Sequence, residues 1–396
     1  MASRVIRTSR RRRKSGVGRF LKHSPWAGEH DKVFTLVLAG LLIFGLAALS
    51  SASSAKAYQE FGSTFAIVWR QILNGILPGL LLFYIFSRVD YHRWQKYRWW
   101  LLGASIFFLV IVFIPGISVT YGRARSWVGF PGFNLQPGEF FKLSFILFLA
   151  AWLADRDPRA NQDLWLGLLP FIVFLGIPAL LIAAQPDPGT MAIVALTALA
   201  IFYIAGARLK HLAWLAVSGV GALTFLVFQA PYRLARITAF LQPEIDQQGV
   251  SYHINQALLA IGSGGLFGRG FGQSRQKFAY LPEVSSDSIF AIIGEEMGFI
   301  MAGLVVVALG ILIWRILIVV RQAPDNFGKL VATGVAAWIF FQSLFNIGAM
   351  LGLLPITGVP LPFISQGGSA MVGLLAACGL IINISRQSLP DKKFIN

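Results

Sequence analysis

Long apolar stretches separated by short polar connections dominate the pattern along this chain of 396 residues. Several of the stretches are close to the ~20 residues that an α-helix needs to cross a membrane. The pattern predicts ten membrane-spanning helices, at residues 33–50, 65–87, 99–114, 139–154, 164–183, 189–205, 211–228, 288–320, 329–350 and 369–384. We therefore expect an all-α, polytopic membrane protein with a single transmembrane domain over residues 33–385.

Composition and charge agree with this class. Hydrophobic residues make up 56% of the chain and charged residues 13%, which leaves too little polar surface for a soluble domain. The formal net charge is +17, and the Lys and Arg residues concentrate on alternate connections and at the two ends. The positive-inside rule therefore predicts that both termini are cytoplasmic. Because the excess charge lies where the topology requires it, nucleic acid is not an expected partner.

The two ends of the chain are polar. Residues 1–32 form a basic N-terminal tail with no apolar core, so we expect it to be disordered. We interpret this tail as a topology signal that lies close to anionic lipid, with a protein-docking arm as the alternative. Residues 386–396 are expected to form a cytoplasmic C-terminal tail. The basic stretch precedes a full span, so no cleavable signal peptide is expected.

The residue types that bind metals are sparse. The single cysteine, Cys378, lies inside the last predicted span, and the five histidines are scattered without metal-ligand spacing. No cofactor held by protein ligands is therefore expected.

The longest connection, residues 229–286 between the seventh and eighth spans, is predicted to lie outside the cell membrane and to be functional, since loops of this length rarely serve only as links. Within it, Ile254, Leu258 and Ile261 recur at helical spacing, which predicts a short amphipathic helix at the outer membrane surface. A glycine-rich stretch, residues 262–272, follows.

This loop carries basic residues on the side that the positive-inside rule would keep neutral: Arg233, Arg236, Arg269, Arg275 and Lys277. Backbone amides of the glycine-rich stretch, together with these cations, suit a phosphate or pyrophosphate, which predicts a polyanionic substrate at the outer leaflet. Anchoring to lipid headgroups is the alternative for any single arginine.

Asp287 stands at the mouth of the eighth span, and Glu295 and Glu296 lie inside it. Carboxylates at membrane depth cost roughly 2.5 kcal/mol or more each, so at least one is expected to be functional. Asp287 is a candidate catalytic residue, but from these residues alone capping of the helix N-terminus is the favoured interpretation. Glu295 and Glu296 are expected to meet polar groups inside the bundle. Gly294 and Gly298, on the face that carries Asp287, are expected to let another helix approach.

Three further polar clusters fall on the same outer side. Glu139 and Lys142 lie three residues apart on one helix face and can pair. The pair either organises a polar cavity, with Lys142 available to an anionic substrate, or is a plain ion pair at the membrane edge. Arg123 and Arg125, upstream in the connection 115–138, add cations to this cluster. The other two clusters hold Asp187 in the turn 185–190, and Ser365 and Gln366 in the turn 360–369. With Asp287, these clusters are predicted to line one outward cavity.

The chain resembles the SEDS family (shape, elongation, division and sporulation) over about residues 33–385. The most specific matches are the runs 232–240, 255–270, 273–277, 281–283 and 294–296, together with Asp287. The runs 236–240 and 273–277 favour the division branch over the elongation branch. One departure is that Ser285, Ser286 and Ser288 surround Asp287, where the family usually has His-Thr before the acid and Phe after it.

The resemblance implies a GT-C-like glycosyltransferase that polymerises lipid II, the undecaprenyl-pyrophosphate-linked disaccharide peptide, in the inner membrane at the division septum. It implies as partners a class B penicillin-binding protein transpeptidase of the FtsI type and other divisome proteins. It also implies that Asp287 is the catalytic residue and that Glu139 and Lys142 line the cavity. Glu283, in the matched run 281–283, joins the substrate-binding candidates.

Joining sugars from a lipid pyrophosphate donor requires a base that takes the proton of the acceptor's 4-hydroxyl, and Asp287 is the candidate. The loop cations, with a divalent cation (Mg²⁺ or Mn²⁺) held by the substrate pyrophosphate, would stabilise the leaving undecaprenyl pyrophosphate. The alternatives are a lipid II flippase, since intramembrane charges and broken helices suit transport equally well, an elongation-type polymerase and a structural scaffold.

Overall fold

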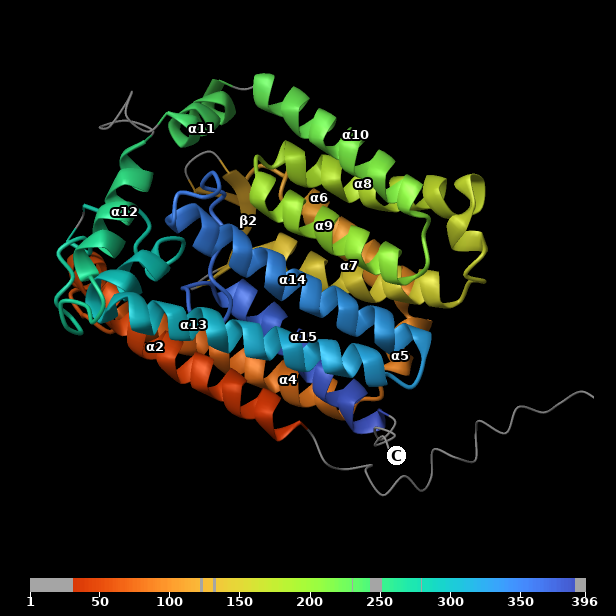
Figure 1. The fold of residues 1–396 in the computed structure, drawn as a ribbon, viewed down its shortest axis with the longest axis horizontal. Coiled ribbons are helices and arrows are strands. Elements are labelled where there is room, and N and C mark those ends of the chain that lie inside the picture. The colour runs from red at the N-terminus through yellow and green to blue at the C-terminus, as the bar shows by residue number, and fades with distance from the viewer. Residues whose placement is uncertain are drawn as a thin grey trace, which may run out of the picture.

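The computed structural model describes residues 31–121, 124–130, 133–229, 231–242, 251–278 and 280–388. Long helices run side by side along the horizontal axis of Figure 1. The helices that coincide with the predicted spans are α2 (Lys32–Phe61), α3 with the π-helix η1 and α4 (Ala66–Gln71, Ile72–Ile76 and Leu77–Arg88), α6 (Arg98–Ile111), α7 (Pro137–Ala154), the π-helix η3 with α8 (Leu164–Leu168 and Leu169–Ala184), α9 (Pro188–Ile204), α10 (Leu209–Phe228), α13 (Ile289–Gln322), α14 (Asn326–Met350) and α15 (Gly368–Gln387).

The all-α membrane class is confirmed. Among the described residues, seven helices are long and apolar enough to cross a membrane: α2, the segment Ala66–Arg88, α7, the segment Leu164–Ala184, α13, α14 and α15. Two further apolar helices, α6 and α9, are shorter. The total of ten spans stays a prediction.

The first helix is longer than predicted. It continues to Phe61, whereas the predicted span ended at residue 50, where a serine-rich run begins. The serines remain helical because their hydroxyls are satisfied inside the bundle: Ser53 donates to the carbonyl of Leu49 at 2.7 Å, and Ser51 donates to Glu296 at 2.7 Å. Hydrogen-bonded serines are tolerated in membrane helices for this reason.

The connection 115–138 contains a small sheet that the sequence reading did not include. Strands β1 (Ser118–Tyr121), β2 (Ala124–Phe130) and β3 (Phe133–Leu135) pair antiparallel in the order β1-β2-β3, with Ser118 opposite Val128 and Gly129 opposite Asn134. Strands β1 and β3, of four and three residues, give only a weak alternation in sequence, so the pattern does not indicate the sheet.

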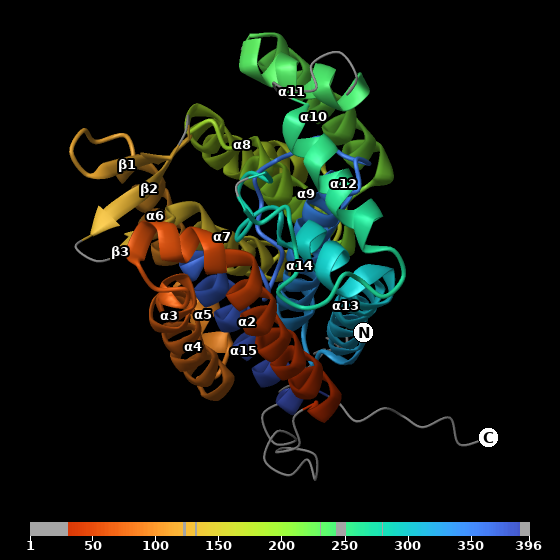
Figure 2. The ribbon, with the colours of Figure 1, turned by 90° about the vertical axis from the view of Figure 1, so that its left-hand side faces the viewer.

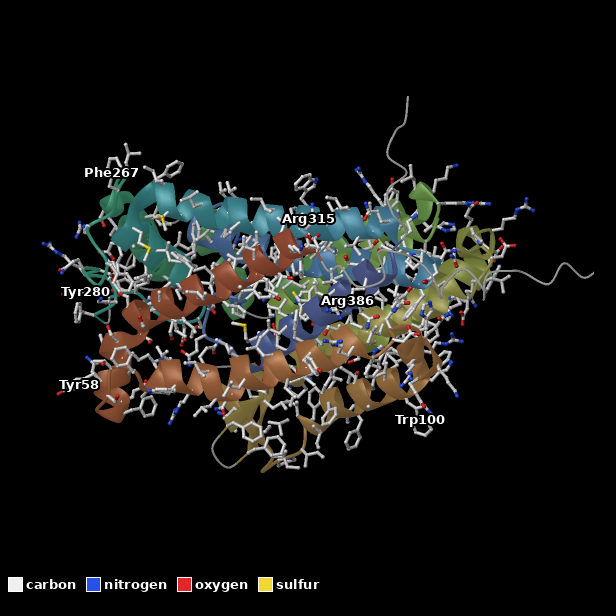
Figure 3. The ribbon with its side chains drawn as sticks, turned by 90° about the horizontal axis from the view of Figure 1, so that it is seen from below. Tyr58, Trp100, Phe267, Tyr280, Arg315 and Arg386 are labelled. Atoms are coloured by element: carbon white, nitrogen blue, oxygen red, sulfur yellow. The ribbon has the colours of Figure 1, made fainter. Side chains whose placement is uncertain are left out.

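The short helices lie at the two ends of the bundle. Helices α11 (Pro231–Leu241) and α12 (Tyr252–Gly264) and strand β2 lie at one end, here named the α12 end. Helix α5 (His92–Lys96) lies at the other end, here named the α5 end. The 3₁₀ helix η2 (Ala160–Gln162), which joins α7 to η3, also lies at the α5 end. Seen from the α12 end, the sheet lies to one side and α12 to the other (Figure 2). Exposed aromatic residues mark both ends: Tyr58, Phe267 and Tyr280 at the α12 end and Trp100 at the α5 end (Figure 3). Aromatic belts of this kind are typical of membrane–water interfaces.

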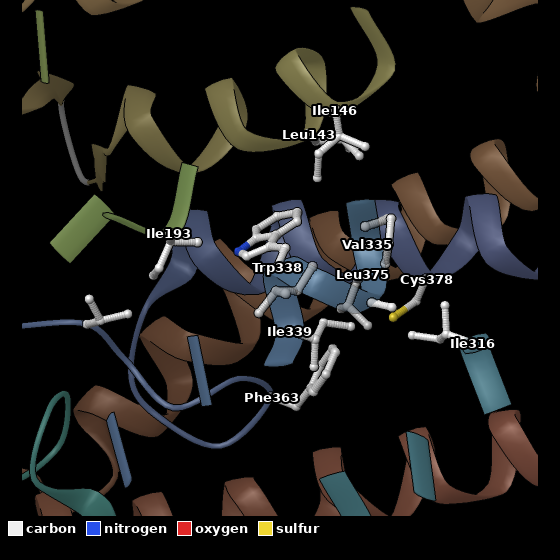
Figure 4. Close-up of a cluster of buried hydrophobic side chains, with 14 of the residues drawn as sticks. Leu143, Ile146, Ile193, Ile316, Val335, Trp338, Ile339, Phe363, Leu375 and Cys378 are labelled. Carbon is white, nitrogen blue, oxygen red and sulfur yellow. The ribbon is translucent and has the colours of Figure 1, made fainter. Parts of the chain in front are cut away.

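The core lies where α7, α14 and α15 meet. Trp338 and Ile339 from α14, Leu375 from α15 and Phe363 from the loop before α15 pack together there (Figure 4), and all are at most 2% exposed. Glycine brings the helices close: a Cβ at Gly379 would lie 2.5 Å from the carbonyl oxygen of Phe83 in α4. Small residues at such contacts are how membrane helices pack.

Helix α12 is confirmed where the sequence placed it, but its buried face differs. The buried residues are Ile254, Ala257, Ala260 and Gly264, whereas Leu258, which the predicted apolar stripe included, is exposed. The face is set by contact with α13, because a Cβ at Gly264 would lie 2.0 Å from the carbonyl oxygen of Gly294. The expected approach of another helix to the small residues of α13 is thereby confirmed.

At the α5 end, a charged latch joins the helix connections. The hydroxyl of Tyr91 donates to Asp325, and His92 lies 2.8 Å from Asp90 and 3.1 Å from Asp325 through its two ring nitrogens. The hydrogen bond to Asp325 raises the pKa of His92 to about 9. Partial burial opposes this rise, and the contact with Asp90 adds to it. Burial alone would raise the pKa of Asp325, but its hydrogen bonds outweigh burial and lower it.

This latch predicts a loss of stability at alkaline pH. A raised histidine pKa means that the stabilisation is complete below the unfolded value of about 6.5 and is lost as the pH rises through about 9. We expect the thermal midpoint of the detergent-solubilised protein to fall between about pH 6.5 and 9.5, and His92→Gln, which cannot ionise, to flatten this dependence. An equal fall in both proteins would contradict the latch.

Candidate active site

Asp287 lies in the turn that leads into α13, at the α12 end. The N-cap of α13 is Ser288, one residue later, and Ser288 uses its hydroxyl to donate to the carbonyl of Pro282 at 2.8 Å. Asp287 is half-buried, and its Oδ2 faces Gly358: a Cβ built on that glycine would lie 3.5 Å from it. The carboxylate therefore stands beside a glycine backbone, where a larger residue would crowd it.

The backbone around Asp287 is fixed by the loop before α15. Gln366 donates its N–H to the carbonyl of Ser285 at 2.8 Å and accepts from the hydroxyl of Ser285 at 2.6 Å. Ser365 donates its hydroxyl to the carbonyl of Ser286 at 2.5 Å. Ser365 and Gln366 therefore contact the turn of Asp287, as expected for one shared site, and hold its backbone. Their predicted role toward substrate stays a prediction.

Two amide side chains of α14, which the sequence reading did not single out, complete this support. Asn346 donates to the carbonyl of Asp287 at 2.8 Å and to that of Val359 at 2.7 Å. One helical turn away, Gln342 donates to the carbonyl of Pro360 at 2.9 Å. The signal was present, because two amides four residues apart in an apolar span lie on one helix face and need partners there.

Glu139 and Lys142 form the predicted ion pair. Both are almost fully buried, and the ammonium lies 2.7 Å from each oxygen of Glu139. Lys142 also donates to Gln342 at 3.0 Å and lies 5.0 Å from the ring centroid of Trp338, whose indole N–H donates to the same Gln342 oxygen. Protein groups surround the ammonium, and Gln342 connects the pair to the loop beside Asp287.

The turn at Asp187 joins the same network. Asp187 caps α9 by accepting from the N–H of Thr190 at 3.0 Å and lies 3.4 Å from the side-chain nitrogen of Gln136. Gln136, at the start of α7, donates its N–H to Ser369 at 2.9 Å. Hydrogen bonds thus connect three of the predicted clusters with the turn of Asp287 at the α12 end.

The remaining candidates lie apart from this network or beyond the description. Arg123 lies outside the described residues, as do the side chains of Arg125, Arg233 and Arg236. Glu283 is exposed, has a positive φ of 47° and accepts from Ser286 at 3.1 Å. Of the other three loop cations, Lys277 and Arg269 contact the carboxylates of α13 through their side chains, and Arg275 contacts Glu295 only through its backbone N–H.

Helix α13 is interrupted at Gly298, which has φ 76° and ψ −178°. In an unbroken helix, the N–H groups of residues 299 and 300 would donate to carbonyls four residues earlier. Instead, Phe299 donates to the carbonyl of Gly265 at 2.9 Å, and Ile300 donates to that of Leu266 at 3.3 Å. The glycine-rich stretch supplies these acceptors.

The same stretch also supplies N–H donors for the carbonyls of Glu295 and Glu296, which the interruption leaves without their helical partners. Arg269 donates its N–H to the carbonyl of Glu295 at 3.0 Å, and Gly270 donates to that of Glu296 at 2.9 Å. Only a glycine fits at position 268 of this stretch, because a Cβ at Gly268 would lie 2.2 Å from the carbonyl oxygen of Glu296. Four backbone hydrogen bonds therefore replace those that the helix lacks.

These contacts correct the expectation that the loop amides are available to a phosphate. Besides the amides of residues 269 and 270, that of Ser274 donates to the carboxylate of Glu296 at 3.2 Å, and those of Arg275 and Gln276 donate to Glu295 at 2.9 and 3.4 Å. The sequence reading failed here because the acceptors for these amides lie on α13, remote from the loop in sequence.

Glu295 and Glu296 meet polar groups inside the bundle, as predicted. Glu296 accepts from Ser51 of α2 at 2.7 Å and from the ammonium of Lys277 at 3.1 Å. Glu295 accepts from the hydroxyl of Ser274 at 2.5 Å. These five residues, here named the glutamate cluster, tie the loop before α13 to α2 and α13. Lys277 is buried in it, whereas Arg269 and Arg275 are exposed.

Comparison with known proteins places this arrangement in a family. A family model described as "Cell cycle protein" (FTSW_RODA_SPOVE) matches residues 31–389. Stage V sporulation protein E of Bacillus subtilis is 39% identical over 358 residues, covering 90% of this chain and 97% of the relative. A protein of Geobacter sp. (strain M18) named "Probable peptidoglycan glycosyltransferase FtsW" is 35% identical over 360 residues, covering 90% and 97%.

Two solved structures have a similar fold. One comes from a study entitled "Structural coordination of polymerization and crosslinking by a peptidoglycan synthase complex", with a TM-score of 0.73 and 24% identity, covering 91% of this chain and 99% of that one. The other is the rod shape determining protein RodA of Thermus thermophilus, with a TM-score of 0.67 and 25% identity, covering 91% and 98%.

The glutamate cluster predicts a large difference between two neighbouring cations. Lys277→Met leaves Glu296 buried without its charged partner, which costs about 3 kcal/mol or more. Arg275→Met removes an exposed charge and keeps the backbone amide that binds Glu295. We expect a clearly lower thermal midpoint only for Lys277→Met, measured in detergent. Similar midpoints for the two variants would show that the ion pair does not hold the loop.

Proposed function

The chain belongs to the cell cycle protein family of FtsW, RodA and SpoVE, and on this basis we propose that it is a peptidoglycan glycosyltransferase that polymerises lipid II into glycan strands for septal wall synthesis. Relatives named as probable peptidoglycan glycosyltransferases support the reaction class. The observation that carries the proposal is the position of Asp287, whose carboxylate is half-buried at the α12 end. The backbone carbonyls of residues 285, 286 and 287 all accept hydrogen bonds from neighbouring elements.

Asp287 acts in this proposal as the general base. Its carboxylate takes the proton of the acceptor's 4-hydroxyl as that oxygen attacks the anomeric carbon of the donor. The new glycosidic bond forms as the bond from the anomeric carbon to the pyrophosphate breaks, and undecaprenyl pyrophosphate leaves. Attack opposite the leaving group inverts that carbon. Rigid hydrogen bonding of residues 285–287 supports this role, because a base must be held in place to be effective.

The negative charge that gathers on the leaving group requires cations. Lys277 and Lys142 are buried against Glu296 and Glu139, so Arg269 and Arg275 are the stronger candidates among the described loop cations. Both arginines are exposed, although Arg269 also lies 3.8 Å from Glu295. A divalent cation, Mg²⁺ or Mn²⁺, carried by the substrate pyrophosphate would supply further positive charge.

We also propose a class B penicillin-binding protein of the FtsI type as partner, together with other divisome proteins, in the cytoplasmic membrane at the septum with both termini inside. The similar fold in a complex that couples polymerization and crosslinking supports such a partner. The basic residues of the connections at the α5 end support the orientation.

The flippase alternative fits the interruption of α13 less well. In transporters, broken helices expose backbone groups to a substrate or ion. Here the four backbone groups at the interruption bond to the loop instead. An elongation-type polymerase remains the closer alternative, since RodA shares the fold.

Replacing Asp287 by asparagine tests the proposal. The substitution keeps the size of the side chain, but an amide cannot accept the proton. We therefore expect Asp287→Asn to fold and to lose polymerisation of purified lipid II by roughly a hundredfold or more. The assay uses protein purified with its transpeptidase partner. The matched control is Asp163→Asn, since Asp163 only caps η3 and asparagine caps as well.

Normal polymerisation by Asp287→Asn would exclude the base assignment. Wild-type protein that moves labelled lipid II across vesicle membranes but never lengthens glycan would support the flippase instead.

A further inference from the structure

A small pocket lies directly beside Asp287, and in this structure it is too narrow to hold a water molecule. Asn346, Ala349 and Met350 of α14 form one side, and the loop residues Ile356 and Val359 form the other. Its walls are therefore mostly apolar, although it adjoins the carboxylate of the proposed base.

Asn346 presents an unsatisfied acceptor in this pocket. Both hydrogens of its side-chain nitrogen are bound, by the carbonyls of Asp287 and Val359. Turning the amide over would place its oxygen against those two carbonyl oxygens, so the orientation is fixed by chemistry. Its Oδ1 is buried and has no hydrogen-bond donor among the described residues.

A buried polar atom without a partner is rare in native proteins and calls for an explanation. The complement of this acceptor is an N–H or O–H donor. The apolar walls add a second requirement, which is that the donor carries an apolar group next to it. A sugar hydroxyl or a water molecule meets the first requirement but not the second, whereas an acetamido group meets both.

Resting on the proposed function, we propose that this pocket is the subsite for the acetamido group of the acceptor sugar. The N–H donates to Oδ1 of Asn346, and the methyl group packs among Ala349, Met350 and Val359. The acetamido group and the attacking 4-hydroxyl lie on carbons two apart in one sugar ring. A sugar whose 4-hydroxyl meets Asp287 therefore brings its acetamido group to the neighbouring pocket.

The loop that forms one wall can admit the group. It runs from Gly352 to Gly358 without helix or strand, and both glycines have positive φ, 66° and 74°. Because Oδ1 is covered in this structure, the group enters as this loop moves aside. Binding of the sugar then orders the loop next to Asp287, which couples recognition of the amino sugar to placement of its hydroxyl.

Competition between acceptor analogues tests the subsite. One analogue of lipid II carries an O-acetyl group in place of the acceptor acetamido group, which keeps the methyl and removes the N–H. A second carries an N-propionyl group, which keeps the N–H and adds one methylene. Each labelled analogue competes with natural lipid II for incorporation by the complex with its transpeptidase. We expect the wild-type protein to incorporate each analogue about tenfold less or worse.

A pocket variant provides the second arm. Met350→Ala enlarges the wall, so it should bring N-propionyl incorporation close to that of natural lipid II while still rejecting the O-acetyl analogue. Met371→Ala, which truncates a buried methionine of α15 outside the pocket, should keep the wild-type preference. Because each measurement is a ratio between substrates of one protein, a smaller folded fraction does not affect it.

The outcomes separate this inference from the proposed function. If the wild-type protein polymerises natural lipid II but incorporates both analogues as readily, or if Met350→Ala leaves the N-propionyl preference unchanged, the subsite is wrong and the polymerase assignment stands. If the wild-type protein polymerises no lipid II at all, the proposed function fails and the subsite fails with it.

Discussion

The structure at the α12 end depends on how the broken helix α13 satisfies its backbone. In a membrane protein, a carbonyl or N–H that loses its helical partner must find another within the protein. At Gly298 the loop residues 265–270 provide both acceptors and donors. The exchange needs glycine at Gly264 and Gly268, where any Cβ would overlap the backbone of α13. This part of the loop before α13, residues 264–270, is thus built into the bundle, where its hydrogen bonds to α13 replace those that the interrupted helix lacks.

This built-in loop determines where the site lies. Its middle is held by the glutamate cluster against α2 and α13. Its end, at residues 285–287, is held by the loop before α15 and by Asn346 of α14. Helices far apart in sequence thereby fix one short turn, and Asp287 gains a defined position although it lies outside any helix. Precise placement of one carboxylate is what general-base chemistry needs, because misplacement of the reacting groups lowers the rate steeply.

The sequence predicted the helices well and the site in part. Apolar periodicity located the seven helices that are long and apolar enough to cross a membrane among the described residues, because lipid and core both select apolar residues. It located Asp287 and the pairing of Glu139 with Lys142, since isolated charges near a membrane are informative. It did not reveal the three-stranded sheet, the hydrogen bonds of the loop amides or the role of Asn346. The sheet and the hydrogen bonds of the loop amides depend on contacts between segments that lie far apart in the sequence, for which the local sequence gives no signal. The amide of Asn346 in an apolar span does indicate that it needs a partner, but it does not indicate which one.

The distribution of charge within the site follows from the same contacts. Glu139 and Glu296 each bind a buried lysine, so two cations that a sequence reading assigns to the substrate are already neutralised. Removing either lysine from its partner would leave a carboxylate uncompensated at membrane depth, so neither is free to follow a moving pyrophosphate. An exposed arginine suffers no such constraint and offers a planar fork of donors that matches phosphate oxygens. The buried lysines therefore shape the site, and in the proposed mechanism the exposed Arg269 and Arg275 of the loop before α13 recognise the leaving group.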